Sequence, residues 1–345
     1  VSSFGDRSSS LYLRPRTKTT GGGRRPSAVN KKGKSCLLYV YGNFGVSIMP
    51  TFSLPLLLYC KHFNALLCVV QVRGGGEYGR EWHAKGSNEN KQNAVDDIIS
   101  AAEYLIRNEF TCRDKLGLLA GTFGATLAAA AMNQRPELFG AAVMEDGVYD
   151  LLRNEELTKP MHWYGASRGK GMIESVRQRN ASTQGNGGDG SADQPESTWS
   201  REFGRLGHGE APCERLLGFS PLHNVRAPLD AAAGATFLHP SLMCITSPVS
   251  RVPGSHSHKY VAELQRVWGA KGRGGPVVLQ SRVEEGGEEE LEDGDDGVKA
   301  KAPRAETRLQ LTAKALYFLA YHTGAVYRDN DNSDSESESD KEGDE

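Results

Sequence analysis

The sequence lacks any run of about 18 apolar residues, the length that a helix needs to cross a membrane. It also lacks the apolar core of a signal peptide at its N-terminus, and its six cysteines include no Cys-x-x-Cys pair. These absences disfavour a membrane protein, a disulfide framework and a zinc knuckle, so we expect a reduced, cytoplasmic protein. The chain starts with Val1 in place of methionine, which is typical of a fragment.

Apolar residues are scarce for a compact enzyme of 345 residues. They make up 38% of the chain, beside 40 glycines and a mean hydropathy of -0.50. A net charge of -2 hides strong local asymmetry, because residues 7–34 are basic whereas 284–296 and 329–345 are acidic. We therefore expect a smaller folded unit with long solvated segments: a basic flexible arm (1–34), a polar disordered insertion (166–212), an acidic loop (283–304) and an acidic disordered tail (326–345).

The terminal segments carry only weak functional signals. The basic arm has no pattern of interleaved aromatic residues, so nucleic-acid binding is not expected. The end of the chain, "SDSESESDKEGDE", resembles an acidic phosphorylation tail, although a solvated end has the same composition. Either charged segment could serve a protein partner.

Between these segments, short apolar runs alternate with stretches of helical periodicity. Runs such as "ALLCVVQV" have the continuous apolar character of strands that are buried on both faces. Strands alternating with helices predict an α/β fold, with a doubly wound, mostly parallel sheet formed by residues 35–165 and 213–325. The pattern predicts strands at 36–42, 65–72, 115–121, 140–146, 237–247 and 275–283, and helices at 90–110, 125–136, 257–270 and 305–322.

Five segments, taken in order, carry a more specific likeness. They are "YVYGNFGVSIMPTFS" (39–53), "RGGGEYGREWHAKG" within 72–106, "NQRPELFGAAVMEDGVYDLLR" (133–153), "FSPLHNV" (219–225) and "RVPGSHSHKY" (251–260). In this order they resemble the prolyl oligopeptidase family of serine peptidases. The resemblance implies an α/β-hydrolase catalytic domain acting on short proline-containing peptides. It also implies a β-propeller, but no segment here reads as propeller blades, so we expect the hydrolase half alone.

The family's nucleophilic serine stands on a sharp strand-to-helix turn, and the aligned residues here are "AGTFGA" (120–125). Thr122 occupies the serine position. Threonine keeps a hydroxyl, but its β-branch adds about 1–3 kcal/mol of strain where the backbone has a positive φ. The same stretch would also suit an unreactive strand-to-helix turn.

The family's catalytic acid follows the strand that we predict at 237–247. The aligned segment "SPVSRV" (247–252) holds Val249 at the acid position, so the acid is lost. No Asp or Glu occurs between Asp230 and Glu263, which means that a small error in alignment does not restore it.

The family's histidine lies in a Gly-His-Gly loop between the last strand and the last helix. The corresponding interval, 281–305, contains no histidine. His256 and His258 begin the preceding predicted helix and His322 lies in the last one, where we interpret them as solvated or capping residues.

The residues that would bind substrate match the family's pattern better than the catalytic residues do. By resemblance, the Tyr41 hydroxyl and the Phe123 backbone N–H would form the oxyanion hole, Phe44 and Trp163 would line the proline pocket, and Arg251 would hold the substrate backbone. Buried aromatic residues more often belong to a core, so the binding roles rest on the resemblance. The glycines of "RGGGEYG" lack the lysine or acid of a phosphate-binding loop, and we expect no cofactor or metal.

Three hypotheses follow. The chain is a prolyl oligopeptidase catalytic domain with an impaired triad, in which Thr122 would form any acyl-enzyme. Alternatively, it is a non-catalytic α/β-hydrolase domain that binds peptides or protein partners. A misread gene model of an active enzyme would also explain the missing start and the missing histidine loop together.

Overall fold

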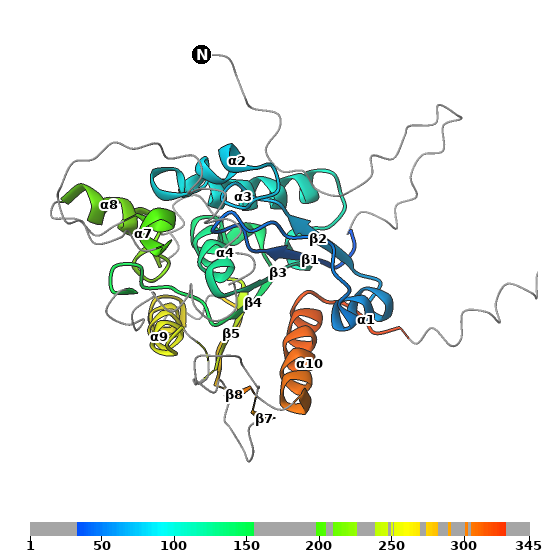
Figure 1. Cartoon of the computed structure of the whole chain (residues 1–345). Coiled ribbons are helices and arrows are strands. Elements are labelled where there is room, and N and C mark those ends of the chain that lie inside the picture. The colour runs from blue at the N-terminus through cyan, green and yellow to red at the C-terminus, as the bar shows by residue number, and fades with distance from the viewer. Residues whose placement is uncertain are drawn as a thin grey trace, which may run out of the picture.

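A computed structural model of the chain describes residues 33–154, 198–204, 210–225, 239–247, 250, 252–269, 274–281, 289–290, 301–302 and 305–328. Its centre is a six-stranded sheet in which every neighbouring pair is parallel. The order across the sheet is β2-β1-β3-β4-β5-β6 (Figure 1). The strands are β1 (Cys36–Val40), β2 (Leu66–Val70), β3 (Leu116–Gly121), β4 (Ala141–Glu145), β5 (Ser241–Thr246) and β6 (Val277–Ser281).

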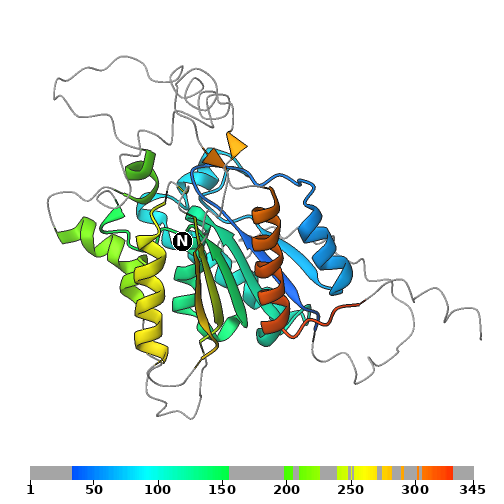
Figure 2. The ribbon, with the colours of Figure 1, turned by 90° about the horizontal axis from the view of Figure 1, so that it is seen from below.

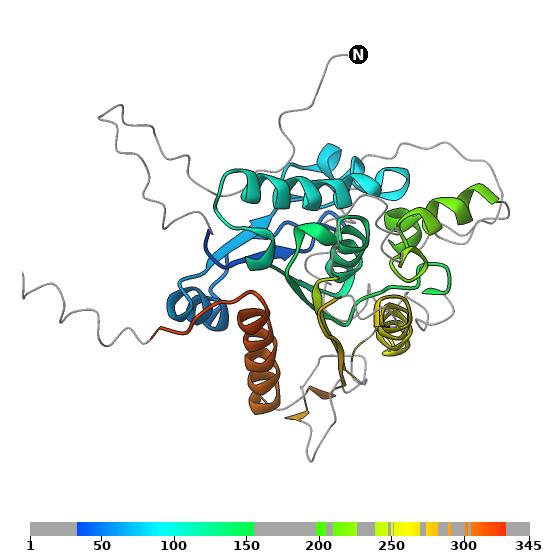
Figure 3. The same ribbon diagram turned by 180° about the vertical axis from the view of Figure 1, so that it is seen from behind.

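Helices cover both faces of this sheet. Helices α1 (Leu54–His62) and α10 (Ala305–His322) lie together on one side, while α3 (Gln92–Arg107), α4 (Thr122–Gln134) and α9 (Ser255–Trp268) cover the other (Figures 2 and 3). Strand residues alternate between the two apolar layers: Leu38 and Val40 pack toward α3 and α4, whereas Leu37 packs toward α10. Because both faces are covered, the strands are apolar almost throughout, as a parallel sheet requires.

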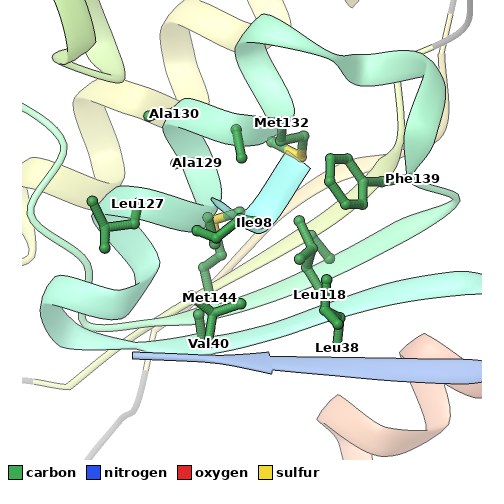
Figure 4. Packing of buried hydrophobic residues seen from close by; sticks show 14 of the residues in the cluster. Leu38, Val40, Ile98, Leu118, Leu127, Ala129, Ala130, Met132, Phe139 and Met144 are labelled. Atoms are coloured by element: carbon green, nitrogen blue, oxygen red, sulfur yellow. The ribbon is translucent and has the colours of Figure 1, made fainter. Parts of the chain in front are cut away.

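The larger layer is packed mainly with small and flexible side chains. Its centre joins Ile98 of α3 and Leu127 of α4 to Leu118 and Met144 on the sheet (Figure 4). Alanines at 128–131 are all buried and let α4 lie close to the strands. This packing fixes the start of α4, which is the part of the fold that positions the site.

The remaining elements are short. They are α2 (Arg80–Ala84), α7 (Thr198–Phe203), α8 (Glu210–Phe219), the antiparallel pair β7 (Glu289–Glu290) and β8 (Lys301–Ala302), and the 3-10 turns η2 (Asn88–Asn90), η3 (Arg113–Lys115), η4 (Pro136–Leu138) and η6 (Leu222–Asn224). No helix in the described ranges is both long and apolar enough to span a bilayer.

The predicted fold class is confirmed, with two differences at the level of elements. Helix α1 was not predicted, since "LPLLLYCKH" shows no periodic separation of apolar and polar residues, and Leu54 and Leu57 are both 53% exposed. The folded part also resumes earlier than residue 213, because α7 and the start of α8 lie within the segment 166–212 predicted as an insertion. In α7, Trp199 and Phe203 are buried, so this end of the segment is not a solvated loop.

Candidate active site

Thr122 stands at the sharp turn between β3 and α4. It is the first residue of α4, and it follows Gly121, the last residue of β3, directly. Its φ is 49°, in the left-handed region that β-branched residues rarely adopt. The backbone strain expected at this position is therefore present, and the partly exposed side chain stands at the carboxyl end of a central strand.

This turn lies where the strand order reverses. From β1 the chain runs outward to β2 and then crosses back to β3 on the other side of β1. The carboxyl ends of β1 and β3 therefore flank a topological switch point, the usual place for a site in an open α/β sheet. Tyr41 directly follows β1, so the structure brings Tyr41 and Thr122 to the same edge of the sheet.

Gly124 allows α4 to begin directly against the end of β1. A Cβ at this position would lie 2.5 Å from the carbonyl oxygen of Val40 and 2.9 Å from Cα of Tyr41. Only glycine fits at such a distance. The N–H of Phe123 is one of the first amides of α4, at the end of the helix where the aligned peptide dipoles favour negative charge. A helix start beside Tyr41 is a suitable place to stabilise an oxyanion.

Beside the turn lies an aromatic cluster separate from both layers of the sheet, which we call the elbow cluster. The Phe123 ring packs against Phe44 at 4.8 Å between ring centroids, Trp199 at 5.7 Å and Phe203 at 5.9 Å. Phe44 and Phe203 are 6.0 Å apart. The elbow cluster comprises these four residues with Val148, Leu151, Leu152, Leu216, Phe219 and Val252.

The elbow cluster bears on two sequence predictions. The ring of Phe44, which was predicted to line a proline pocket, packs against the ring of Phe123. The tryptophan that the structure places there is Trp199, whereas Trp163 lies outside the described residues. Trp199 lies in the segment predicted as an insertion, where the polar sequence "STWSREFG" gives no periodic signal of burial. Val249 and Arg251 also lie outside the described residues.

Histidines were predicted to be absent from the turn, and each described histidine makes its contacts elsewhere. No hydrogen bond joins the Thr122 hydroxyl to any of the seven histidines that the structure describes. Their hydrogen-bond partners are Arg328 O for His62, Glu202 for His83, Ser220 for His223, Pro240 O for His239, the Asp150 N–H for His256, Gly254 O for His258 and Ser241 for His322. His162 and His208 lie outside the described residues.

The interpretation of His256 as a solvated or capping residue is wrong. Its side chain is fully buried, and Nδ1 accepts the backbone N–H of Asp150 at 3.2 Å. Burial lowers the pKa of His256 to about 4, so the ring is neutral near pH 7. His258 does stand at the exposed start of α9, where Nδ1 lies 2.6 Å from the Gly254 carbonyl oxygen. His322 bonds Ser241, the first residue of β5, and so lies at the opposite edge of the sheet from Thr122.

An imidazole–carboxylate pair does occur on α2 and α7, and the sequence did not indicate it. Nε2 of His83 lies 2.7 Å from one oxygen of Glu202, and Nζ of Lys91 lies 2.5 Å from the other. Burial raises the pKa of Glu202, but the hydrogen bonds and charges of His83 and Lys91 outweigh it and lower the pKa overall. A Cβ at Gly45 would lie 3.5 Å from the His83 ring, which places this pair behind the loop that carries Phe44.

A carboxylate at the strand edge was also missed. Asp146 directly follows β4, the neighbour of the strand that carries Thr122, and adopts a φ of 48°. Its Oδ1 accepts the backbone N–H of Ser247, the first residue after β5, at 2.8 Å. An acid just after a buried strand is the signal that could have drawn attention to it. Asp146 is therefore an acid that the structure places at the edge shared by Thr122 and Ser247.

A second group of Ser, His and Asp is structural. Ser220 Oγ lies 2.8 Å from Nδ1 of His223, whose Nε2 lies 4.0 Å from Oδ1 of Asp150. Ser220 is completely buried, and its hydroxyl also lies 3.3 Å from the Leu151 N–H and 3.3 Å from the Tyr149 carbonyl oxygen. No substrate carbonyl can reach an enclosed hydroxyl with these partners, so the group clamps η6 onto the segment after β4.

Comparisons with known proteins identify the family. A model described as "Prolyl oligopeptidase family" matches residues 51–183. A prolyl endopeptidase from Dictyostelium discoideum is 34% identical over 232 residues, which cover 67% of this chain and 25% of that protein. The prolyl oligopeptidase ophP of Omphalotus olearius is 31% identical over 243 residues, covering 70% and 27%. This chain carries a prolyl oligopeptidase family domain.

Solved structures support the same assignment. A chain from a structural study of two prolyl endopeptidases superimposes with a TM-score of 0.63 at 28% identity, covering 88% of this chain and 35% of that one. The family and the α/β-hydrolase fold predicted from the sequence are therefore confirmed. The chain spans about a quarter of the length of the two curated relatives.

Proposed function

We propose that this prolyl oligopeptidase family domain is catalytically impaired as a peptidase. In a complete site, a histidine would take the hydroxyl proton while the oxygen attacks the carbonyl carbon of the proline residue, and the proton would then pass to the amine of the next residue as it leaves. The Thr122 hydroxyl, the Tyr41 side chain and the Phe123 N–H supply the nucleophile position and the oxyanion donors of such a reaction. The described histidines, however, are bonded to other groups.

The missing base carries the proposal. The interval 281–305, where the family's histidine belongs, has no histidine in the sequence. Asp146 offers an acid that could orient an imidazole, but an acid without the imidazole does not activate a hydroxyl at neutral pH. Loss of the base from a triad costs on the order of 10⁶ in kcat, which takes a turnover of about 10 s⁻¹ to roughly one event per day.

A labelling experiment tests the proposal. The purified full chain is treated with a fluorophosphonate and, separately, with a fluorogenic Gly-Pro peptide, beside the Thr122→Ala variant as background. We expect neither labelling nor hydrolysis above that background. Stoichiometric labelling of Thr122, or hydrolysis that Thr122→Ala abolishes, would overturn the proposal. The fluorophosphonate result tests the reactivity of the Thr122 hydroxyl even if the fluorogenic peptide is a poor substrate, because the reagent does not depend on peptide recognition.

A further inference from the structure

We propose that the ring of Phe123 plugs the apolar subsite beside the elbow, so that this residue determines whether the site can accept a substrate side chain. The inference rests on the proposed function only in taking Thr122 as the position where a peptide carbonyl would lie. A peptide in that position must place the neighbouring side chain against the wall of the turn. That wall is the elbow cluster, and its centre is already filled.

The contacts of the Phe123 ring show how completely it fills the centre of the elbow cluster. Phe123 is 3% exposed and, within the described part of the chain, its ring meets those of Phe44 from the loop after β1 and of Trp199 and Phe203 from α7. It is the only residue of α4 in the elbow cluster, although α4 contributes many residues to the layer against the sheet. The Phe123 ring therefore points away from the sheet core and into a cluster formed by loops and short helices.

The walls around Phe123 are held independently of its ring. Trp199 and Phe203 stack on each other at 4.1 Å, and Glu202 between them on α7 is tied to Lys91 and His83. The Lys91 ammonium also lies 4.6 Å from the centre of the Phe203 ring. These interactions do not involve Phe123, so the walls should remain in place when its side chain is shortened.

Removing the ring should therefore open a cavity instead of collapsing the cluster. A phenyl ring leaves a space about the size of benzene, and dry apolar cavities of roughly 150 Å³ bind benzene. The five-membered ring of proline is smaller than the ring that it would replace. Phe123→Ala also keeps the backbone N–H at the start of α4, so the proposed oxyanion donor is unchanged.

The test is a binding measurement on the full chain. The probe, benzyloxycarbonyl-Gly-Pro amide, is titrated calorimetrically into the native protein, Phe123→Ala and Phe219→Ala. Phe219 belongs to the same cluster but makes its ring contact with Phe203, at 6.5 Å, and none with Phe123. We expect Phe123→Ala to bind the probe at least tenfold more tightly than the native protein, and Phe219→Ala to show no gain.

Two outcomes overturn the plug. One is native protein that binds the probe as tightly as Phe123→Ala; the other is a folded Phe123→Ala variant that gains no affinity, or no more than Phe219→Ala gains. If Phe123→Ala does not fold, Phe123→Leu keeps most of the apolar volume and should show a smaller gain in the same direction. Labelling of Thr122 would refute the proposed impairment without affecting the proposal that the Phe123 ring fills the subsite, so the two failures are distinguishable.

Discussion

The ammonium of Lys91 lies 2.5 Å from a carboxylate oxygen of Glu202, and the exposed fractions of the two side chains are 0% and 2%. The two residues are 111 positions apart. Their ion pair fastens α7 to the start of α3 and thereby holds Trp199 and Phe203 beside the elbow. A buried charge that loses its partner is expensive, so this contact controls the wall of the candidate site.

We predict that Glu202→Gln destabilises the protein by about 3–5 kcal/mol, because Lys91 is left charged and buried without a carboxylate. Urea unfolding followed by circular dichroism measures the change. The matched control is Glu263→Gln, which breaks the exposed pair with Arg266 on α9 and should leave the midpoint almost unchanged. Equal effects of the two substitutions would contradict the role given to the buried pair.

Stability should fall on acidification because of two buried histidines. Burial lowers the pKa of His256 and of His239 to about 4 from the ordinary 6.5. A depressed folded-state pKa means that the unfolded chain binds these protons first, so the free energy of unfolding decreases as the pH drops from 6.5 toward 4. His256→Asn, which can still accept the Asp150 N–H, should reduce the slope of that decrease, because one of the protons bound on unfolding is removed. A slope identical to that of the native protein would refute this origin.

Gly124 should tolerate no side chain. We expect Gly124→Ala to lower the free energy of unfolding by about 1–3 kcal/mol or more, because the new methyl group meets the Val40 carbonyl oxygen, a backbone atom that cannot move aside. Gly218→Ala in α8 is the control, since a Cβ there has no neighbour within 4 Å. That variant should be neutral or gain up to about 1 kcal/mol. A neutral Gly124→Ala would mean that α4 does not start against β1.

The backbone strain at Thr122 should be measurable as a gain in stability when a residue that tolerates a positive φ replaces the threonine. Thr122→Gly is expected to raise the free energy of unfolding by about 1 kcal/mol, because glycine adopts a φ of 49° without the penalty of a β-branch. The same exchange at Thr312, inside α10, should lower stability by about 0.3 kcal/mol, the difference between the helix propensities of threonine and glycine. Chemical denaturation of both variants gives the sign of each change in the free energy of unfolding. A decrease on substitution of Thr122 would argue against a strained turn.

The fold was largely predictable because its signals are local. Buried parallel strands such as "LLCVV" need a continuous apolar run, and α3 shows its buried face at helical spacing, so composition and period identify each element. The turn at Thr122 could be placed for the same reason, since it joins a recognisable strand to a recognisable helix.

The surroundings of the turn could not be predicted, because they depend on contacts between distant segments. Glu202 lies in a polar stretch whose burial depends on its ion pair with Lys91, far away in sequence. The burial of His256 likewise depends on Asp150, 106 positions away. Phe123 itself was assigned a role through its backbone, while the position of its ring is set by residues on the loop after β1 and on α7.

The central claim is the absence of a base for the elbow hydroxyl, and fluorophosphonate labelling of Thr122→Ser tests it most directly. This variant restores the serine of the family's turn and leaves everything else unchanged, so its reactivity reports on whether a base reaches the hydroxyl. The account predicts that it reacts no faster than Thr122→Ala. Rapid, stoichiometric modification at residue 122 would show that a base is present after all.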